Sequence, residues 1–213
     1  MKQQDFQKFF SSKLGLFAKN KISESLLSFI PNLEKQKILI IGNGSIYLKN
    51  NKNIKQIKEL SENTVIADDY YDFVIVSHFL EFQNKDNFII RKIWQCLKDN
   101  GKVVTITPNR HGLWFYFNNN VFKTPKAYSH YQITKLLDSN LLITDRVESV
   151  LFFPPIHNSK ISEKWMEKID KVISLIACKN GGIIISSAIK RVYASALHNK
   201  SADTSTKYIV INE

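Results

Sequence analysis

The sequence is poor in cysteine and lacks any long apolar run. The only cysteines among its 213 residues are Cys96 and Cys178, and neither belongs to a CxxC or Cys/His cluster of the kind that zinc sites require. We therefore expect both to be buried free thiols. No apolar stretch reaches the ~20 residues of a membrane-spanning helix, and the amino terminus lacks the apolar core and cleavage site of a secretory signal. These absences predict a cytoplasmic protein without a membrane span.

Internal repeats and linkers are absent as well, which predicts a single α/β domain. Hydrophobic residues make up 44% of the chain and aromatic residues 12%, enough to fill the core of a domain of this length. We expect three parts: an amino-terminal helical segment (residues 1–34) packed on the domain, the domain itself (residues 35–198) and a carboxyl-terminal tail (residues 199–213).

Basic residues outnumber acidic ones, and the formal net charge is +11. A positive field favours encounters with phosphate-rich partners. The lysines are nevertheless scattered along the chain and mixed with asparagine, instead of forming one basic tract. We therefore favour a solvated basic surface over a nucleic-acid-binding face. If the lysines did bind nucleic acid, the affinity would fall steeply with salt. The sequence does not indicate an oligomeric state.

Short apolar runs alternate with helical patterns along the chain. The first of these runs is continuous, as in a strand that is buried on both faces. The order strand, helix, strand implies right-handed parallel crossovers and hence an α/β sheet with helices on both faces. Strands are predicted at residues 37–41, 72–78, 102–107, 141–153 and 181–188, and helices at residues 5–30, 85–97, 129–137 and 162–177.

A ligand in such a sheet binds where the carboxyl ends of the strands meet. The loops after Ile41, Ser77 and Thr107 should therefore converge. Gly42 and Gly44 follow the first strand, and glycines at this place let the backbone approach a cofactor and leave amide donors free. A Gly-Asn-Gly tripeptide by itself is also an ordinary strand-ending turn.

Three motifs follow one another in a fixed order: IIGNGSIYL, YDFVIVSHFLEF and LKDNGKV. They resemble the glycine loop, the "fDvV…H.LEh" strand and the "vLkpgG" turn of class I S-adenosylmethionine-dependent methyltransferases. NRHGLW, PKAYS and the ending GGIIISSAIKRVY look like landmarks of a bacterial subgroup with a divergent glycine loop, so the resemblance covers roughly residues 6–195. It implies a Rossmann-like sheet, S-adenosylmethionine as cofactor and methyl transfer to an unidentified acceptor.

The resemblance also implies roles for particular residues. The glycine turn would hold the methionine end of the cofactor, and an acidic side chain would hold the adenosine. His78 would act as a base, although a histidine at a strand end is also often a hydrogen-bonded structural residue. Trp114 would form an apolar wall for the acceptor or, alternatively, a partner surface. The implied cofactor residues are Gly42, Asn43, Gly44, Glu62, Asp68 and Ser77, and the implied acceptor residues are Asn109, Arg110, Trp114 and Tyr128.

The chain departs from the family pattern in two ways. It lacks the acidic residue before the glycines and the third glycine. About thirty residues separate the glycine loop from the Tyr71-Asp72 strand, room for one helix and one short strand where the family has two strands and a helix. The carboxylate that binds the ribose therefore has no evident counterpart, and Glu62, Asp68 and Asp69 are either substitutes or a solvated turn. A catalytically inactive, methyltransferase-like scaffold or partner-binding protein is the alternative interpretation.

Overall fold

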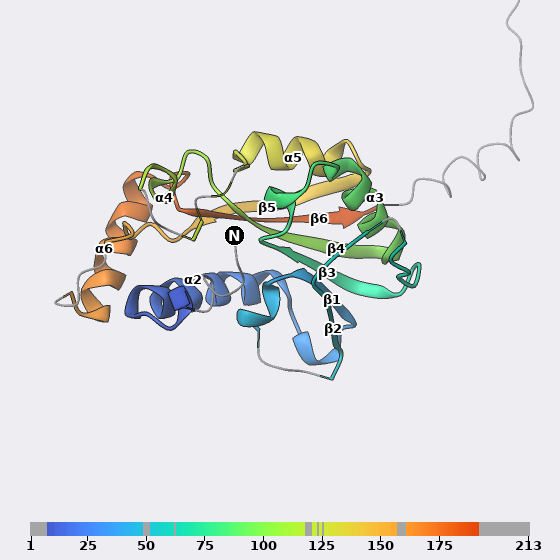
Figure 1. Cartoon of the computed structure of the whole chain (residues 1–213), viewed down its shortest axis with the longest axis horizontal. Helices are drawn as coiled ribbons and strands as arrows, with labels where there is room; N and C mark the ends of the chain where they lie inside the picture. The colour runs from blue at the N-terminus through green and yellow to red at the C-terminus, as the bar shows by residue number, and fades with distance from the viewer. Residues whose placement is uncertain are drawn as a thin grey trace, which may run out of the picture.

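A mixed β-sheet forms the middle layer of the computed structural model, which describes residues 8–48, 52–61, 63–117, 121–122, 124, 126–156 and 161–191 (Figure 1). Within these residues the sheet has six strands in the order β2-β1-β3-β4-β6-β5. Strands β1 to β4 are parallel, whereas β6 is antiparallel to both of its neighbours. The strands are β1 (Ile38–Gly42), β2 (Ile54–Ile57), β3 (Tyr71–Ser77), β4 (Leu97–Pro108), β5 (Leu142–Val150) and β6 (Ile183–Lys190).

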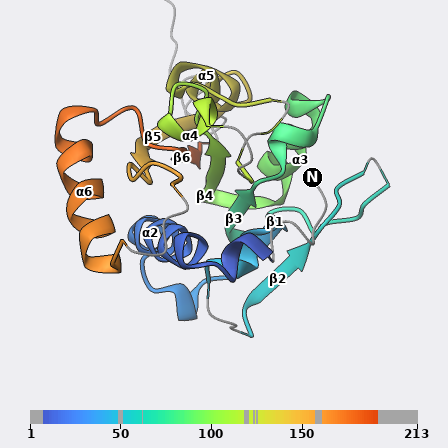
Figure 2. The same cartoon turned by 60° about the vertical axis from the view of Figure 1, so that its left-hand side comes forward.

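Helices cover both faces of the sheet, as the sequence predicts. Helices α2 and α6 pack on one face, and α3 and α5 pack on the other (Figures 1 and 2). The helices are α2 (Lys13–Phe29), α3 (Asp86–Cys96), α4 (Leu113–Tyr116), α5 (His130–Asp138) and α6 (Glu163–Ile176), with 3-10 turns η1 (Leu33–Lys35), η2 (Gly44–Ile46) and η3 (Leu80–Phe82).

The core has two layers because successive strand side chains point to opposite faces. In β1, Ile38 and Ile40 belong to the cluster under α2, whereas Leu39 and Ile41 belong to the cluster under α3 and α5. All four are completely buried. The continuous apolar run is thus a strand buried on both faces, and its last residue, Gly42, reaches the edge of the sheet.

The boundary between α3 and β4 differs from the prediction. The helix ends at Cys96, close to the predicted end, but β4 begins at Leu97 instead of Lys102. Leu97 pairs with Tyr71 ahead of a register shift, so the strand continues through the turn at Asn100, whose φ is 60°. The turn of the LKDNGKV motif therefore lies inside the strand.

The two cysteines lie in different environments. Cys96 is buried as predicted, and burial raises the pKa of its thiol to about 12, which keeps it protonated and unreactive. Cys178 is exposed, so the prediction of a buried thiol is wrong there. The reason is that α6 ends at Ile176, which places Cys178 in the turn between α6 and β6.

Among the described residues, no helix combines the length and apolarity needed to cross a membrane. The predicted tail, residues 199–213, lies outside the part of the chain that the structure describes.

Candidate functional site

The glycine turn after β1 is pressed against the end of β3. Gly42 has a φ of +87°, and a Cβ atom there would lie 2.3 Å from the carbonyl oxygen of Ser77. The amide of Asn43 donates to that same carbonyl at 3.0 Å. Only glycine fits this close approach, and the first amide of the turn is bonded to the protein itself.

A buried chain of three polar side chains joins the segments that follow β1 and β3. The Tyr47 hydroxyl lies 2.8 Å from Nε2 of His78, and Nδ1 of His78 lies 3.2 Å from Oε1 of Glu81. All three residues are at most 3% exposed. His78 has a φ of 48°, in the left-handed region that non-glycine residues seldom adopt. This backbone turns its ring back over η3, where Glu81 lies.

The pKa of the Tyr47 phenol bears on the hydrogen bonds among these three side chains. Burial, and then the negative charge of Glu81, raise the pKa of Tyr47 well above its ordinary value of 10.0. The hydroxyl therefore keeps its proton. A neutral imidazole at His78 would accept a hydrogen bond from this hydroxyl at Nε2 and donate one from Nδ1 to Glu81.

Aromatic rings enclose the hydrogen-bonded side chains of Tyr47 and His78. Phe122 stacks on the His78 ring at 5.3 Å, and Phe10 meets Tyr47 edge-on at 5.8 Å. Phe9 and Trp114 both contact Phe122. The wall therefore combines residues from the amino-terminal segment with residues that follow β4, and it makes the site an apolar environment.

Three buried oxygen atoms at this edge have no hydrogen-bond partner among the described residues: Ser77 Oγ, Glu81 Oε2 and Thr107 Oγ1. They belong to the end of β3, to η3 and to the end of β4. A buried polar atom without a partner costs about 1–3 kcal/mol. Such atoms in a native fold require an explanation, and a bound ligand is one.

The predicted acceptor residues lie in different environments. Asn109 is buried, and its side chain donates to the carbonyls of Lys179 and Gly181 at 2.8 Å and accepts from the amide of His111. Arg110 is exposed. Asn109 and Tyr128 form an isolated parallel bridge, which brings the two segments together.

Tyr128 and Trp114 are both buried. The Tyr128 hydroxyl donates to Oδ2 of Asp86 at 2.9 Å, and desolvation, followed by the charge of Asp86, raises its pKa far above the ordinary value. Trp114 is fully buried and donates from Nε1 to the carbonyl of Phe153 at 2.8 Å. Complete burial places the Trp114 side chain in the hydrophobic core, and its role as an acceptor wall stays a prediction.

The acidic candidates do not come together with the glycine turn. Asp68 is exposed and precedes β3, at the opposite end of that strand from Ser77. Seven strand residues separate the two ends by roughly 23 Å. Asp69 pairs with Lys190 at that same far edge. Glu62 lies outside the described residues.

A surface pocket of about 330 Å³ opens beside the segment that carries Glu62 in the sequence. It lies between the residues after β2 and the start of α3. The end of η3 contributes Phe82, so the same short turn borders the pocket and carries Glu81. The pocket is lined by Leu60, Ser61, Phe82, Gln83, Asn84, Lys85, Phe88 and Ile89.

No family model and no curated protein sequence matches this chain. Solved structures do match it over most of its length. A methyltransferase from Thermotoga maritima that uses S-adenosylmethionine superposes with a TM-score of 0.63 at 14% identity, covering 88% of this chain and 96% of that one. A methyltransferase of the same kind from Aquifex aeolicus gives 0.59 at 12% identity, covering 89% and 99%. One from Archaeoglobus fulgidus gives 0.54 at 16%, covering 87% and 98%.

The chain has the fold of the class I S-adenosylmethionine-dependent methyltransferases. The predicted fold class is therefore confirmed. Relative to the strand order 3-2-1-4-5-7-6 of that fold, the described residues form every strand except the one outside β2. The predicted shortening is thus located: between Gly42 and Tyr71 the described residues contain only the turn η2 and the strand β2.

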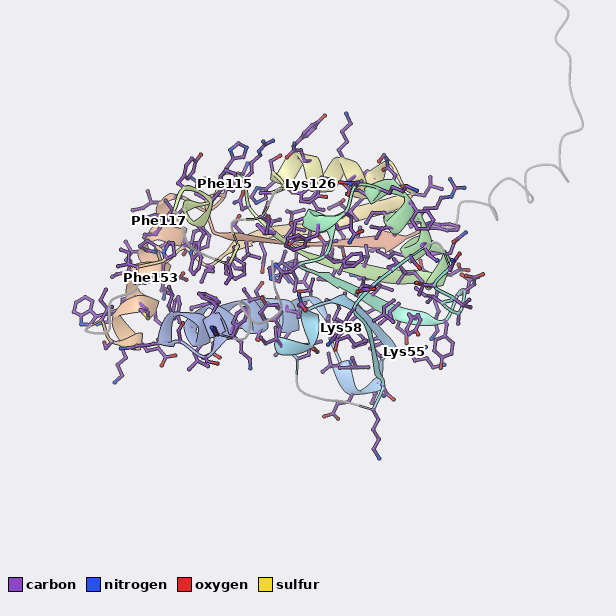
Figure 3. All side chains as sticks on the ribbon, in the orientation of Figure 1. Lys55, Lys58, Phe115, Phe117, Lys126 and Phe153 are labelled. Atoms are coloured by element: carbon purple, nitrogen blue, oxygen red, sulfur yellow. The ribbon has the colours of Figure 1, made fainter. Side chains whose placement is uncertain are left out.

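The end of β2 carries a cation where the methyltransferase pattern has a carboxylate. Ile41 pairs with Ile57 in the last step of the register, and Lys58 follows directly after the strand (Figure 3). Lys58 is exposed, and Glu59 follows it. The sequence does not predict this position, because β2 is polar and its residues do not indicate the register of its pairing with β1.

Sequence reasoning also missed the Tyr47–His78 bond. His78 and Glu81 stand in a recognised motif three residues apart, but nothing local indicates the tyrosine, which is 31 residues from His78. The partial signal was the missing third glycine. Because Ile46 stands there and the turn is a single 3-10 turn, the chain brings Tyr47 inward.

Proposed function

We propose that this protein is an S-adenosylmethionine-dependent methyltransferase that holds the methionine end of the cofactor where β1 and β3 end. The observation that carries the proposal is the set of unpartnered buried acceptors, Ser77 Oγ and Glu81 Oε2, beside the glycine turn. The ammonium group of a methionine moiety offers donors to both. Gly42, Asn43 and Gly44 form the backbone on the other side of this position.

The adenosine end is assigned to the neighbouring pocket. Its volume of about 330 Å³ is at the lower end of the range for small-molecule sites. Phe82 and Phe88 offer apolar surface to a purine. Glu62 follows Ser61, which lines the pocket, and is the acidic residue that this assignment favours over Asp68.

The cofactor supplies an electrophilic methyl group, and this chain positions the acceptor and excludes water. The rings of Phe122, Trp114 and Phe10 provide the apolar surroundings in which proximity and desolvation act. His78 serves as base at Nε2. In the structure the Tyr47 hydroxyl occupies the hydrogen-bonding position at that atom. For His78 to act as base, the Tyr47 side chain therefore has to rotate away from Nε2 or relay the proton of the acceptor to it. The acceptor stays unassigned.

A second candidate is a methyltransferase-like protein that no longer binds the cofactor. It is favoured by the Tyr47–His78 bond, which spans the two strand ends between which the methionine moiety would lie. Lys58 at the ribose position favours it too, because a cation there replaces an acceptor of the ribose hydroxyls.

Calorimetry and thermal shift with S-adenosylhomocysteine separate the two candidates. We expect the wild-type protein to bind at millimolar ligand or below, and Ser77→Ala to weaken binding about tenfold through the loss of one hydrogen bond. Tyr131→Ala, an exposed residue on α5, is the matched control and should bind normally.

The variant Tyr47→Ala tests whether the Tyr47 side chain blocks the proposed binding position of the methionine moiety. Binding by this variant but not by the wild type would establish the second candidate, with Tyr47 as the closing residue. Absence of binding by both proteins would also rule out the methyltransferase, and would show that the Tyr47 side chain is not what prevents cofactor binding.

A further inference from the structure

Helix α6 exposes an apolar face that points away from the protein. Its buried side consists of Met166 and Asp170. Oδ1 of Asp170 accepts the amides of Phe152 and Phe153 at 2.7 and 2.8 Å, which fixes the rotation of the helix about its axis. The opposite side is therefore held outward. The exposed fractions on it are 60% for Trp165, 55% for Val172, 79% for Leu175 and 83% for Ile176.

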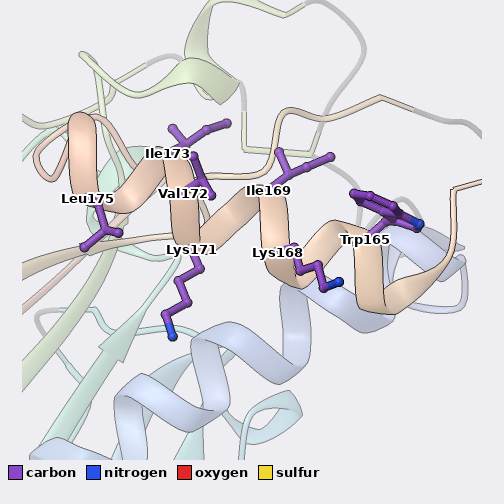
Figure 4. A pocket seen from close by; sticks show the side chains of 7 residues that line it. All are labelled: Trp165, Lys168, Ile169, Lys171, Val172, Ile173 and Leu175. Carbon is purple, nitrogen blue, oxygen red and sulfur yellow. The ribbon is translucent and has the colours of Figure 1, made fainter.

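Lysines border this apolar face along its length. At 100° per residue, Trp165, Val172 and Ile176 share one stripe of the helix. Lys164, Lys168 and Lys171 share the adjacent stripe, and all three are exposed. Figure 4 shows Trp165 and Ile169 on one side of α6 and the amino groups of Lys168 and Lys171 on the other. Apolar and cationic groups thus lie parallel along one exposed surface.

This face lines an open, shallow pocket of about 530 Å³, whose side chains Figure 4 shows. All its described lining residues come from α6, so no other described element covers the face. A surface helix of a globular protein normally turns its apolar stripe inward. An exposed apolar stripe with a polar border marks an interaction site.

We propose that α6 lies flat in the interface of an anionic lipid bilayer. Trp165, Val172 and Ile176 enter the boundary of the acyl chains, and the lysine stripe contacts the headgroups. This arrangement of an apolar stripe, a tryptophan and flanking lysines is the pattern of interfacial helices. The net charge of +11 complements an anionic surface.

The dimensions of α6 fit a helix that lies on a membrane. Its 14 residues span about 21 Å, which is shorter than the hydrocarbon core of a bilayer. α6 is at one end of the molecule, and β6 carries the chain from there to the opposite end (Figure 1). The sheet and the glycine turn therefore stay on the water side.

Vesicle sedimentation tests the proposal with the full chain. We expect binding to phosphatidylcholine vesicles that contain about 30% phosphatidylserine, weak binding to pure phosphatidylcholine, and release at high salt, because charges near the surface are screened. Tryptophan emission should shift to the blue on binding. Trp114 is fully buried and Trp94 half-buried, so Trp165 reports the transfer from water.

Variants separate the apolar and cationic contributions. Leu175→Ser with Ile176→Ser should weaken binding about tenfold. Replacing Lys164, Lys168 and Lys171 by Gln should remove the preference for anionic vesicles, again by at least about tenfold at roughly 1 kcal/mol per lysine. Trp165→Phe should keep binding but lose the emission shift. Tyr131→Ser on α5 is the matched control, since Tyr131 is 71% exposed and also has a lysine beside its ring.

Three outcomes would overturn the proposal. The first is the absence of binding to anionic vesicles by a protein with a normal circular dichroism spectrum. The second is equal binding by the Leu175→Ser/Ile176→Ser double variant and the Tyr131→Ser variant. The third is a concentration-dependent dimer that disappears in the double variant, which would make a second copy of the chain the occupant of this face.

Discussion

Two residues at the strand ends have left-handed backbone, and they face the same site. Gly42 adopts a φ of +87° at no steric cost, whereas His78 adopts a φ of 48° with a full side chain. A conformation of this kind costs about 1–3 kcal/mol and persists where the surroundings impose it. Tyr47, Glu81 and the ring of Phe122 impose it on His78.

The substitution Gly42→Ala tests the close approach of the turn to β3. We expect it to lower the free energy of unfolding by at least about 2 kcal/mol, because the new Cβ would lie 2.3 Å from the Ser77 carbonyl at a positive φ. Urea denaturation measures the loss. Ser45→Ala, at an exposed position in η2, should change stability by less than about 0.5 kcal/mol; equal losses would contradict the steric explanation.

At this scale the sequence predicts positions better than contacts. Gly42 is the last residue of β1 and His78 directly follows β3, close to the positions that the motifs predict. The bond from Tyr47 depends on the length of the turn that replaces a helix, and the position of Lys58 depends on the register of β2. Neither quantity is encoded in a local pattern, because both result from the packing of segments that are distant in sequence.

The elements follow the sequence where hydrophobic period and capping agree. Helix α5 begins after Ser129, as predicted. It has a capping box in which Ser129 Oγ accepts from the amide of Gln132 and the Gln132 side chain accepts from the amide of Ser129. Helix α6 begins after Ser162, also close to the predicted start, but that serine makes no capping hydrogen bond. The two serines therefore differ in energy, although they stand at equivalent positions.

This difference gives a matched pair of variants. Ser129→Ala should destabilise the protein by about 1 kcal/mol, since the amide of Gln132 loses its acceptor, the Ser129 hydroxyl. Ser162→Ala should cost no more than a few tenths of that, because it breaks no side-chain bond. Chemical denaturation of both variants gives the comparison. Similar losses would show that the serine residue matters through its backbone preference alone.

Strand β2 shows where element prediction fails. The spacing predicts a short strand in the gap before Tyr71, but not its place. Lys55 and Gln56 are exposed, and its two isoleucines are only half-buried. An edge strand has one partner and needs no continuous apolar run. Its signal therefore lies in the pairing with β1, which the sequence alone does not reveal.

At the scale of the whole molecule, three ion pairs among the described residues lie at the edge of the sheet opposite the candidate site. Asp72 at the start of β3 pairs with Lys98 at 2.6 Å and accepts from the amide of Lys37 at 2.8 Å. Lys102 pairs with Asp145 at 2.7 Å. Ion pairs thus join the amino ends of the parallel strands. The hydrogen-bonded side chains of Tyr47, His78 and Glu81 join the segments that follow the carboxyl ends of β1 and β3.

These ion pairs predict the response to acid. Burial alone would raise the pKa of Asp72, but the bonds and charges of Lys98 and Lys37 outweigh it and lower the pKa below 3.8. A lowered pKa in the folded state stabilises the protein above the unfolded pKa, and this stability is lost as the pH falls through the folded value. Thermal unfolding from pH 7 down to pH 2 should therefore show a fall in stability that begins near pH 4.

Asp72→Asn isolates that contribution. We expect the variant to lose about 1 kcal/mol at neutral pH and to show a shallower decline with acid than the wild type. Asp99→Asn, at an exposed position, serves as the control with an unchanged profile. An identical acid profile for all three proteins would place the acid sensitivity elsewhere.

The place of β6 in the sheet has a consequence for biosynthesis. β6 is the last strand of the described chain, yet it lies between β4 and β5 and pairs with both along its length. Until residue 190 has emerged from the ribosome, β4 and β5 each present an unpaired edge, and such edges recruit other strands. Between the completion of β4 at Pro108 and the emergence of β6, the nascent chain therefore exposes unpaired strand edges, and we expect a truncation before Ile183 to aggregate.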